Sequence, residues 1–211
     1  MYTIEKDGWK FIILFALIGL GFIFLIEVLW PLGILFLLLA AATAGFFRQP
    51  RIDKTFAEGE IVAPASGKII DIREIEEEDF LKEKVRRVSI FMSVLDEHIN
   101  YAPLAGEVAH LAHRPGQFRQ AFREEASAEN EAQTIGFQSG ERSWMIKQIA
   151  GLVARRIVCR CRIGERLRAG QKLGMIRFGS RVELFFPLST DFSVKLGDKV
   201  KGGRTVMGKM R

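Results

Sequence analysis

The chain has 211 residues, of which 48% are hydrophobic, enough for one or two domains with a sizeable core. Lys and Arg exceed Asp and Glu by 31 to 25, so the formal net charge is +6. No DNA- or RNA-binding motif accompanies this basic balance. We therefore expect no nucleic-acid partner, and an anionic lipid surface fits better because an apolar segment lies at residues 11–47.

Two apolar runs, residues 11–26 and 32–47, are separated by a short segment that holds Glu27 and Pro31. A signal peptide would have one short apolar run and a small-residue cleavage site. A single continuous span would bury Glu27 in hydrocarbon, which is costly. A helical hairpin instead places Glu27 and Pro31 at its far turn. At about 1.5 Å per residue, each run falls short of a core of about 30 Å, so spanning and monotopic hairpins both stay open.

Basic residues flank the two runs: Lys6, Lys10, Arg48 and Arg51. In a hairpin they lie on one side of the membrane, and Lys and Arg are enriched on the cytoplasmic side. We therefore predict that residues 1–47 anchor the chain in the cell membrane as a transmembrane or monotopic helical hairpin. Residues 48–211 are then a domain on the cytoplasmic side.

After a polar linker, short apolar and β-branched segments alternate with turns that contain Gly or Pro, which predicts strands. Residues 87–95 have the composition of a buried strand, and residues 144–161 form a long strand-like stretch. Residues 118–132 mix Gln, Arg, Glu and Ala, which favours one short helix there.

Two sequence patterns recur in this part of the chain. Residues 64–69 are repeated at 103–108, as a strand entered through a tight turn. Residues 164–174 are repeated at 197–208, as a hairpin with an acidic residue after its first glycine. The combination resembles the hammerhead halves of biotinyl- and lipoyl-type domains. It predicts a mainly β fold, a barrel-sandwich-hybrid-like antiparallel β domain. The lysine that those domains modify is not seen between paired halves, which disfavours a carrier role.

Few residues offer catalytic or metal-binding chemistry. Cys159 and Cys161 point the same way if they lie on a strand, which disfavours a disulfide, and two thiols alone make no zinc site. We predict no metal. His98 follows a hydrophobic strand and Asp96, and it precedes Asn100. A polar cluster at the end of a buried strand suits an acid or base, although a structural histidine is the alternative.

Arginines recur with partial alternation in one stretch: Arg155, Arg156, Arg160, Arg162, Arg166 and Arg168. On a strand, one face would be cationic. Two interpretations stay open. The charges either form a solvated face that keeps an edge from pairing, or they contact phosphate head groups.

Four blocks, in order, are similar to the compact bacterial and archaeal phosphatidylserine decarboxylases: residues 91–100, 126–131, 148–159 and 174–182. The last block reads Gly-Met-Ile-Arg-Phe-Gly-Ser-Arg-Val and contains Gly179 and Ser180. Each block alone is a weak signal, but the four in order are a strong one, because they are spread across most of the soluble chain, and the apolar pair at the N-terminus also fits. By this resemblance the chain is identified as a member of the family.

The resemblance implies a pyruvoyl enzyme that converts phosphatidylserine to phosphatidylethanolamine in phospholipid biosynthesis. The Ser180 hydroxyl attacks the carbonyl of Gly179, and the resulting ester eliminates to leave a covalent pyruvoyl group derived from Ser180. This autocatalytic cleavage divides the chain into residues 1–179 and 180–211, which remain together as a heterodimer. The pyruvoyl group then serves as the electron sink for decarboxylation.

His98 matches the family histidine that serves acid–base steps, with Asp96 beside it as an orienting residue. Ser66 stands where the family commonly has the aspartate of Pro-Ala-Asp-Gly, which larger members use to activate the serine. Tyr101 stands where those members have a second histidine. Two alternatives remain: an uncleaved, inactive homologue, and a membrane-anchored barrel-sandwich adaptor without catalysis.

Overall fold

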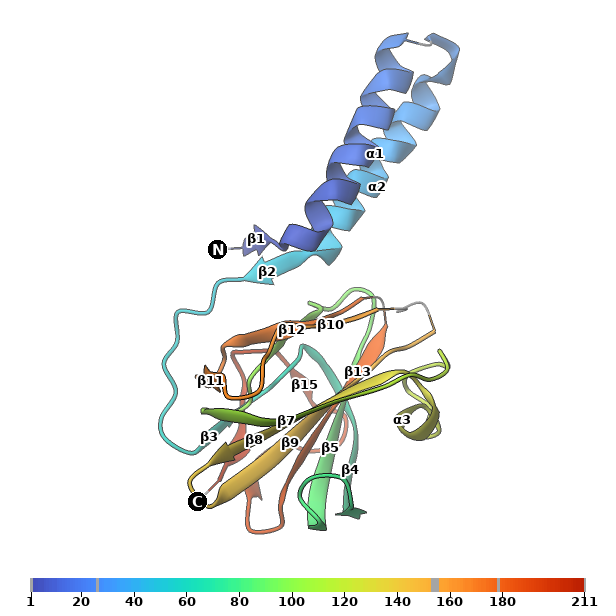
Figure 1. The fold of residues 1–211 in the computed structure, drawn as a ribbon. Coiled ribbons are helices and arrows are strands. Elements are labelled where there is room, and N and C mark those ends of the chain that lie inside the picture. Colours follow the sequence, from blue (N-terminus) through green and yellow to red (C-terminus); the bar gives the residue numbers. More distant parts are fainter. Residues whose placement is uncertain (1, 26, 153–155, 178, 211) are drawn as a thin grey trace. The chain divides into compact units, whose positions relative to one another are not determined.

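The computed structural model describes residues 2–25, 27–152, 156–177 and 179–210. The chain divides into two compact units, one up to Arg51 and the other from Ile52 onward. The first is helical and the second is built almost wholly from strands (Figure 1).

The first unit is the expected helical hairpin. Helix α1 (Lys6–Leu25) leads through the short 3-10 helix η1 (Glu27–Leu29) into α2 (Trp30–Phe46). Outside the helices, β1 (Tyr2–Ile4) pairs antiparallel with β2 (Arg48–Pro50), a pairing that the polar composition of this linker did not predict. Helix α1 is long and apolar enough to cross a membrane, whereas α2 has 17 residues.

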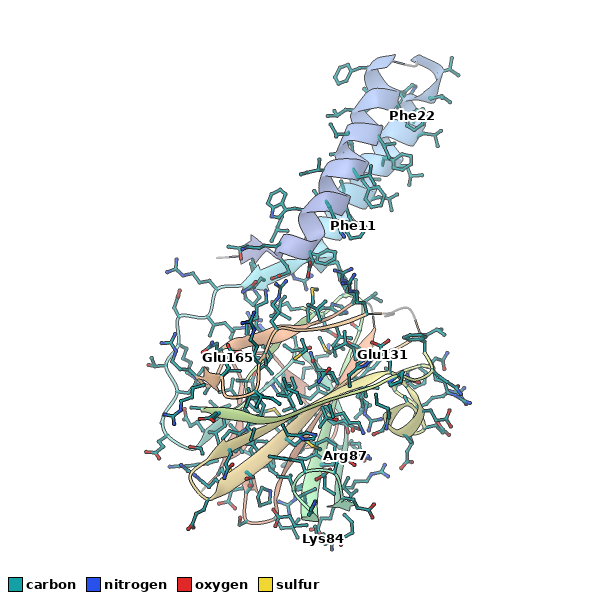
Figure 2. All side chains as sticks on the ribbon, viewed as in Figure 1. Phe11, Phe22, Lys84, Arg87, Glu131 and Glu165 are labelled. Carbon is teal, nitrogen blue, oxygen red and sulfur yellow. The ribbon has the colours of Figure 1, made fainter. Side chains whose placement is uncertain are left out.

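Two glycines let the hairpin helices approach closely. A Cβ atom on Gly19 would lie 2.9 Å from the Gly33 carbonyl oxygen, and one on Gly33 would lie 2.7 Å from the Gly19 carbonyl oxygen. Small residues at a helix contact are typical of helix packing in membranes. Apolar side chains project from the hairpin, among them Phe11 and Phe22 (Figure 2).

The second unit contains one eight-stranded sheet and two smaller sheets, and every pairing between its named strands is antiparallel (Figure 1). In spatial order the large sheet contains β11 (Arg166–Leu167), β7 (Gly106–Arg114), β8 (Ala132–Ser139), β9 (Arg142–Ile149), β13 (Ser180–Pro187), β5 (Glu83–Met92), β4 (Gly67–Glu77) and β15 (Lys199–Val200).

The smaller sheets have three strands each. One contains β10 (Ile157–Cys159), β12 (Lys172–Ile176) and β6 (Ile99–Tyr101), and the other contains β14 (Asp191–Phe192), β16 (Val206–Lys209) and β3 (Glu60–Val62). The one helix described in this unit is α3 (Ala126–Glu129). The mainly antiparallel β domain with an N-terminal helical hairpin confirms the predicted fold class.

Strand β13 is buried on both faces, whereas antiparallel sheets commonly expose one face to water. Val182, Leu184 and Phe186 belong to the main hydrophobic core, and the alternate residues Arg181 and Glu183 are buried on the opposite face. The sheet therefore has an apolar core on one side and a covered polar face on the other.

Two details differ from the sequence prediction or sharpen it. The long strand predicted over residues 144–161 is two strands, β9 and β10, because the chain leaves the sheet after Ile149; residues 153–155 lie outside the described part. The repeated glycines open turns, since Gly164 and Gly197 have φ values of 82° and 93°, a left-handed conformation that glycine adopts without steric cost.

Candidate active site

Three strand ends meet at one end of the large sheet. Antiparallel pairing sets Ser180, the first residue of β13, opposite Met92, the last residue of β5. The pairing of β13 with β9 sets Arg181 opposite Ile149, the last residue of β9. The loops that follow β5 and β9 and the loop that precedes β13 therefore emerge together (Figure 1).

Ser180 is fully buried on the core face of β13. Its hydroxyl donates to the Met92 sulfur at an Oγ–Sδ distance of 3.4 Å, and a thioether is a weak acceptor. The preceding Gly179 has a φ of 58°, and a Cβ atom there would meet nothing within 4 Å. Glycine is thus needed at position 179 for its backbone conformation and not for lack of space.

His98 lies against this same peptide. Its Nδ1 atom donates to the backbone carbonyl of Asp96 at 2.8 Å, which leaves Nε2 as the acceptor. The Gly179 N–H donates to Nε2 in a long hydrogen bond of 3.4 Å. The ring is fully buried, so its unprotonated nitrogen faces the Gly179–Ser180 peptide away from water. The structure brings together the histidine, glycine and serine that the sequence singled out.

Asp96 orients His98 through its main chain. Its carboxylate instead accepts the Ser93 N–H at 2.8 Å, while its own N–H donates to the Ser93 carbonyl at 3.0 Å. Both bonds close the turn between β5 and β6. The acid–base role expected for Asp96 stays a prediction, and the geometry favours a part in fixing the turn.

Two buried amides lie near Met92: Asn100, which belongs to the polar cluster seen in the sequence, and Gln148, which the sequence analysis missed. Asn100 donates from Nδ2 to the Met92 sulfur at 3.7 Å, and Gln148 donates from Nε2 to the Asn100 Oδ1 atom at 2.7 Å. Among the described residues, the buried Gln148 Oε1 atom has no hydrogen-bond partner. Burying a polar group without a hydrogen bond costs free energy, so an unsatisfied buried amide calls for an explanation such as a functional role. The sequence signal for this pair was an amide side chain within each of two largely apolar, strand-like segments.

Gly151 lies directly against the Gly179 carbonyl. A Cβ atom at position 151 would lie 1.9 Å from the Gly179 carbonyl oxygen and 3.0 Å from its carbon. Gly151 follows β9 by two residues, so the end of that strand backs directly onto the Gly179–Ser180 peptide. A glycine in a loop carries no visible signal of such a contact in one sequence.

Ser66, at the position of the expected aspartate, has its own partners. Its hydroxyl donates to Glu97 at an oxygen–oxygen distance of 2.9 Å and accepts the Gly202 N–H at 2.9 Å. Arg204 also binds the same Glu97 carboxylate. Glu97, directly before His98, thus supplies a carboxylate near position 66 that the sequence analysis did not identify.

A buried ionic cluster lies on the opposite face of the sheet. Arg181 binds Glu183 at 2.6 Å, and Glu183 accepts the Ser127 hydroxyl at 2.9 Å. Arg181 also donates to the Ser89 hydroxyl at 2.8 Å. Burial lowers the pKa of Arg181, and the Glu183 carboxylate opposes that shift. The residue that follows Ser180 is therefore held in place from the face opposite the serine.

The arginines expected along one strand face do not share one, because β10 ends before Arg160 and β11 begins at Arg166. Arg155 lies outside the described residues, and the other five are exposed. The thiols of Cys159 and Cys161 are both free. Within the described ranges, no group of three His, Cys, Asp or Glu side chains forms a metal site.

Comparison with known proteins identifies the family of this chain. The family model for phosphatidylserine decarboxylase matches residues 39–208. A phosphatidylserine decarboxylase proenzyme from Magnetococcus marinus is 42% identical over 99% of this chain and 95% of its own length. Proenzymes of that name from Symbiobacterium thermophilum and Nocardia farcinica are 38% and 46% identical, over 98% and 80% of this chain and 95% and 73% of their own lengths. The chain therefore belongs to the phosphatidylserine decarboxylase family, which makes it an enzyme of the carboxy-lyase class.

Proposed function

We propose that the chain is a self-processing proenzyme that decarboxylates phosphatidylserine to phosphatidylethanolamine after cleavage between Gly179 and Ser180. The observation that carries the proposal is the contact of His98 Nε2 with the Gly179 N–H beside a fully buried serine. Membership in the family supports the reaction, and the relatives' description as proenzymes supports the processing.

The cleavage begins when Ser180 Oγ attacks the Gly179 carbonyl carbon. The C–O bond forms, the C–N bond breaks, and the hydroxyl proton moves to the Ser180 nitrogen. Elimination then releases the Gly179 carboxylate and leaves a dehydroalanine, and water replaces its nitrogen to give ammonia and the pyruvoyl group. His98 Nε2, which faces this peptide, carries protons in these steps.

The residues present fit a pyruvoyl group at position 180. Ser180 is excluded from water, and Asn100 and Gln148 place a buried polar pair next to its Met92 partner. When formed, the group supplies an electron sink for the charge left by loss of CO2. His98 then donates the proton that the product needs, and the buried Asn100 and Gln148 amides orient polar atoms of the substrate.

The substrate assigned here is an anionic phospholipid of the membrane. The apolar α1 helix supports membrane attachment, and we propose that the hairpin anchors the protein in the cell membrane with the β unit on the cytoplasmic side. Residues 1–179 and 180–211 then remain paired, since β13 of the small fragment is hydrogen-bonded to β5 and β9 of the large one.

An uncleaved homologue is the second candidate, and Ser66 is the observation that favours it. The aspartate that activates the serine in larger family members is absent at this position. Glu97 lies 2.9 Å from the Ser66 hydroxyl, so a carboxylate is nevertheless present in that neighbourhood. The adaptor alternative has no comparable support, because the chain belongs to a family of decarboxylases.

The intact mass of the purified full-length protein, together with CO2 release from phosphatidylserine, tests the proposal. We expect two fragments that divide at residue 180, the smaller blocked at its N-terminus as pyruvoyl. Ser180→Ala removes the nucleophile, so it should remain one chain without activity. His98→Ala that is cleaved but inactive would limit His98 to decarboxylation. A wild-type protein that stays uncleaved contradicts the proposal and favours the inactive homologue.

A further inference from the structure

Exposed hydrophobic side chains surround the candidate active site. Val94, Leu95 and Leu152 are 53%, 83% and 55% exposed, and Phe122 is 55% exposed. We call these four residues the active-site rim. Large exposed apolar groups that gather at one place mark interaction sites more often than scattered ones do.

The rim residues come from segments that touch the site. Val94 and Leu95 follow Met92, whose sulfur accepts the Ser180 hydroxyl. Leu152 follows Gly151, which lies against the Gly179 carbonyl. These contacts place the apolar groups on the loops next to the Gly179–Ser180 peptide.

Phe122 reaches the same region from the segment that covers the polar face of the sheet. Its ring packs edge-on against Phe91 with centroids 5.9 Å apart, and Phe91 is paired with Arg181 across the strands. The preceding Ala121 side chain would lie 3.2 Å from a Cβ at Gly151. Phe122 therefore lies near the same strand ends as the site, on the sheet face opposite Ser180.

The turn that carries Val94 and Leu95 is built to present them. Ser93 and Asp96 exchange two hydrogen bonds that close it, Ser93 N–H to the Asp96 carboxylate and Asp96 N–H to the Ser93 carbonyl. The central positions of such turns usually hold Gly, Pro, Asn, Asp or Ser. Two exposed branched aliphatic residues there gain nothing in water, so a partner that buries them is the simplest physical reason for their presence.

Exposed arginines flank the rim. Arg156 follows Leu152 by four residues in the sequence. Its carbonyl accepts the N–H of Arg177, which precedes Gly179 by two residues. Arg123 is exposed beside Phe122, and it is followed by the exposed acidic residues Glu124 and Glu125. Single apolar side chains on separate loops, interspersed with cationic ones, match the interface of a bilayer that contains anionic lipids. This chemistry fits a membrane surface better than one continuous protein interface.

We propose that the active-site rim inserts into the head-group region of an anionic bilayer, so that a lipid head group reaches position 180 without leaving the membrane. This inference rests on the proposed function, because a lipid substrate must meet a catalytic group that is fully buried in the β unit. The rim is thus a second membrane contact of the chain, formed by loops and separate in sequence from the apolar hairpin.

The first test compares two forms of phosphatidylserine with the full-length protein in liposomes. We expect Leu95→Glu to be cleaved normally and to lose at least about tenfold in kcat/KM on long-chain phosphatidylserine in the bilayer, because a charge replaces an inserting Leu. Its activity on a short-chain, water-soluble phosphatidylserine should stay that of the wild type. Leu188→Glu is the matched control, since Leu188 is 37% exposed at the other end of β13.

Four outcomes overturn the proposal. The first is that Leu95→Glu retains full activity on bilayer substrate. The second is that it loses both activities equally, and the third is that Leu188→Glu has the same effect. A change in oligomeric state caused by Leu95→Glu also overturns it, because the rim would then bind a second protein. A wild type that is inactive on both substrates would contradict the proposed function instead.

A second measurement tests the rim without depending on activity. Leu95→Trp and Leu188→Trp are compared with the wild type in liposomes whose lipids are brominated near the head group. We expect additional fluorescence quenching for Leu95→Trp alone. Equal additional quenching of the two variants would show that position 95 has no preferred membrane contact, and none in either would show that the rim stays in water.

Discussion

At the residue scale, Gly151 lies against the carbonyl that Ser180 would attack in the proposed cleavage. In the Gly151→Ala variant, a Cβ would lie 1.9 Å from the Gly179 carbonyl oxygen, so the carbonyl has to move. Misplacement of a reacting group by about 1 Å costs about 100-fold in rate, and we expect self-cleavage to slow by that order. The decay of the precursor after cell-free synthesis, followed by intact mass, measures the effect.

Gly174→Ala is the matched control for this prediction. A Cβ at position 174 would lie 1.9 Å from the Val158 carbonyl oxygen, an equally severe clash that involves β10 and β12 instead of the cleavage site. If Gly151 acts by position, Gly174→Ala cleaves faster than Gly151→Ala when their losses of thermal stability are similar. Equal cleavage rates would mean that both substitutions act only through the stability of the fold.

At the element scale, the polar face of the large sheet depends on charge pairs between neighbouring strands. Asp71 of β4 binds Arg87 of β5 at 2.8 Å and Arg73 at 2.9 Å. Burial of Asp71 opposes its charged form, but hydrogen bonds from Arg87 and Arg73 outweigh burial and hold the pKa of Asp71 below its usual value. A carboxyl with a lowered pKa stabilises the fold above its unfolded pKa, and this contribution is lost as pH falls through the folded value.

We therefore expect Asp71→Asn to reduce the free energy of unfolding at pH 7 by about 1–2 kcal/mol, as charge-assisted hydrogen bonds are removed. The difference from the wild type should disappear at pH values below the folded pKa of Asp71, where the wild-type carboxyl is neutral. Urea unfolding at several pH values measures it. Glu74→Gln, which removes an exposed pair with Lys84, should change little. A loss that persists unchanged in acid would trace the effect to packing.

The sequence predicted elements better than contacts. Hydropathy alone predicted the hairpin with Glu27 at its turn, and the repeated glycines predicted the tight turns at Gly164 and Gly197. The proximity of His98 to Ser180 followed from family resemblance, because the two residues lie in separate blocks of the chain. Pairing register then decides which residues between those blocks touch, and one sequence does not give the register.

Bulges illustrate why the rest was out of reach. The pairing of β4 with β5 shifts between Ile69 and Asp71, and such a shift changes which side chains face the core. The use of the Asp96 main chain to orient His98 is equally invisible, since a sequence identifies side chains and not carbonyl directions. Because one sequence does not show such contacts, the sequence analysis singled out the Asp96 side chain and missed Gly151.

At the scale of the whole molecule, the proposed cleavage turns internal contacts into contacts between two chains. The small fragment would contribute β13 to the middle of the large sheet, with β5 on one side and β9 on the other. Ser66 and Glu97 of the large fragment also bind Gly202 and Arg204 of the small one. Fragments joined in this way unfold and separate together, so the stability of the cleaved protein depends on its concentration.

This dependence gives a prediction that distinguishes cleaved from uncleaved protein. The urea midpoint of the cleaved wild type should rise with protein concentration, whereas that of Ser180→Ala should not. In both backgrounds Ser66→Ala should lower the free energy of unfolding by about 1–3 kcal/mol, because it leaves the buried Gly202 N–H without its acceptor. Ser193→Ala, exposed in the small fragment, is the control for loss of a hydroxyl. A concentration-independent midpoint for a protein whose mass shows two fragments would contradict a joint unfolding of the pair.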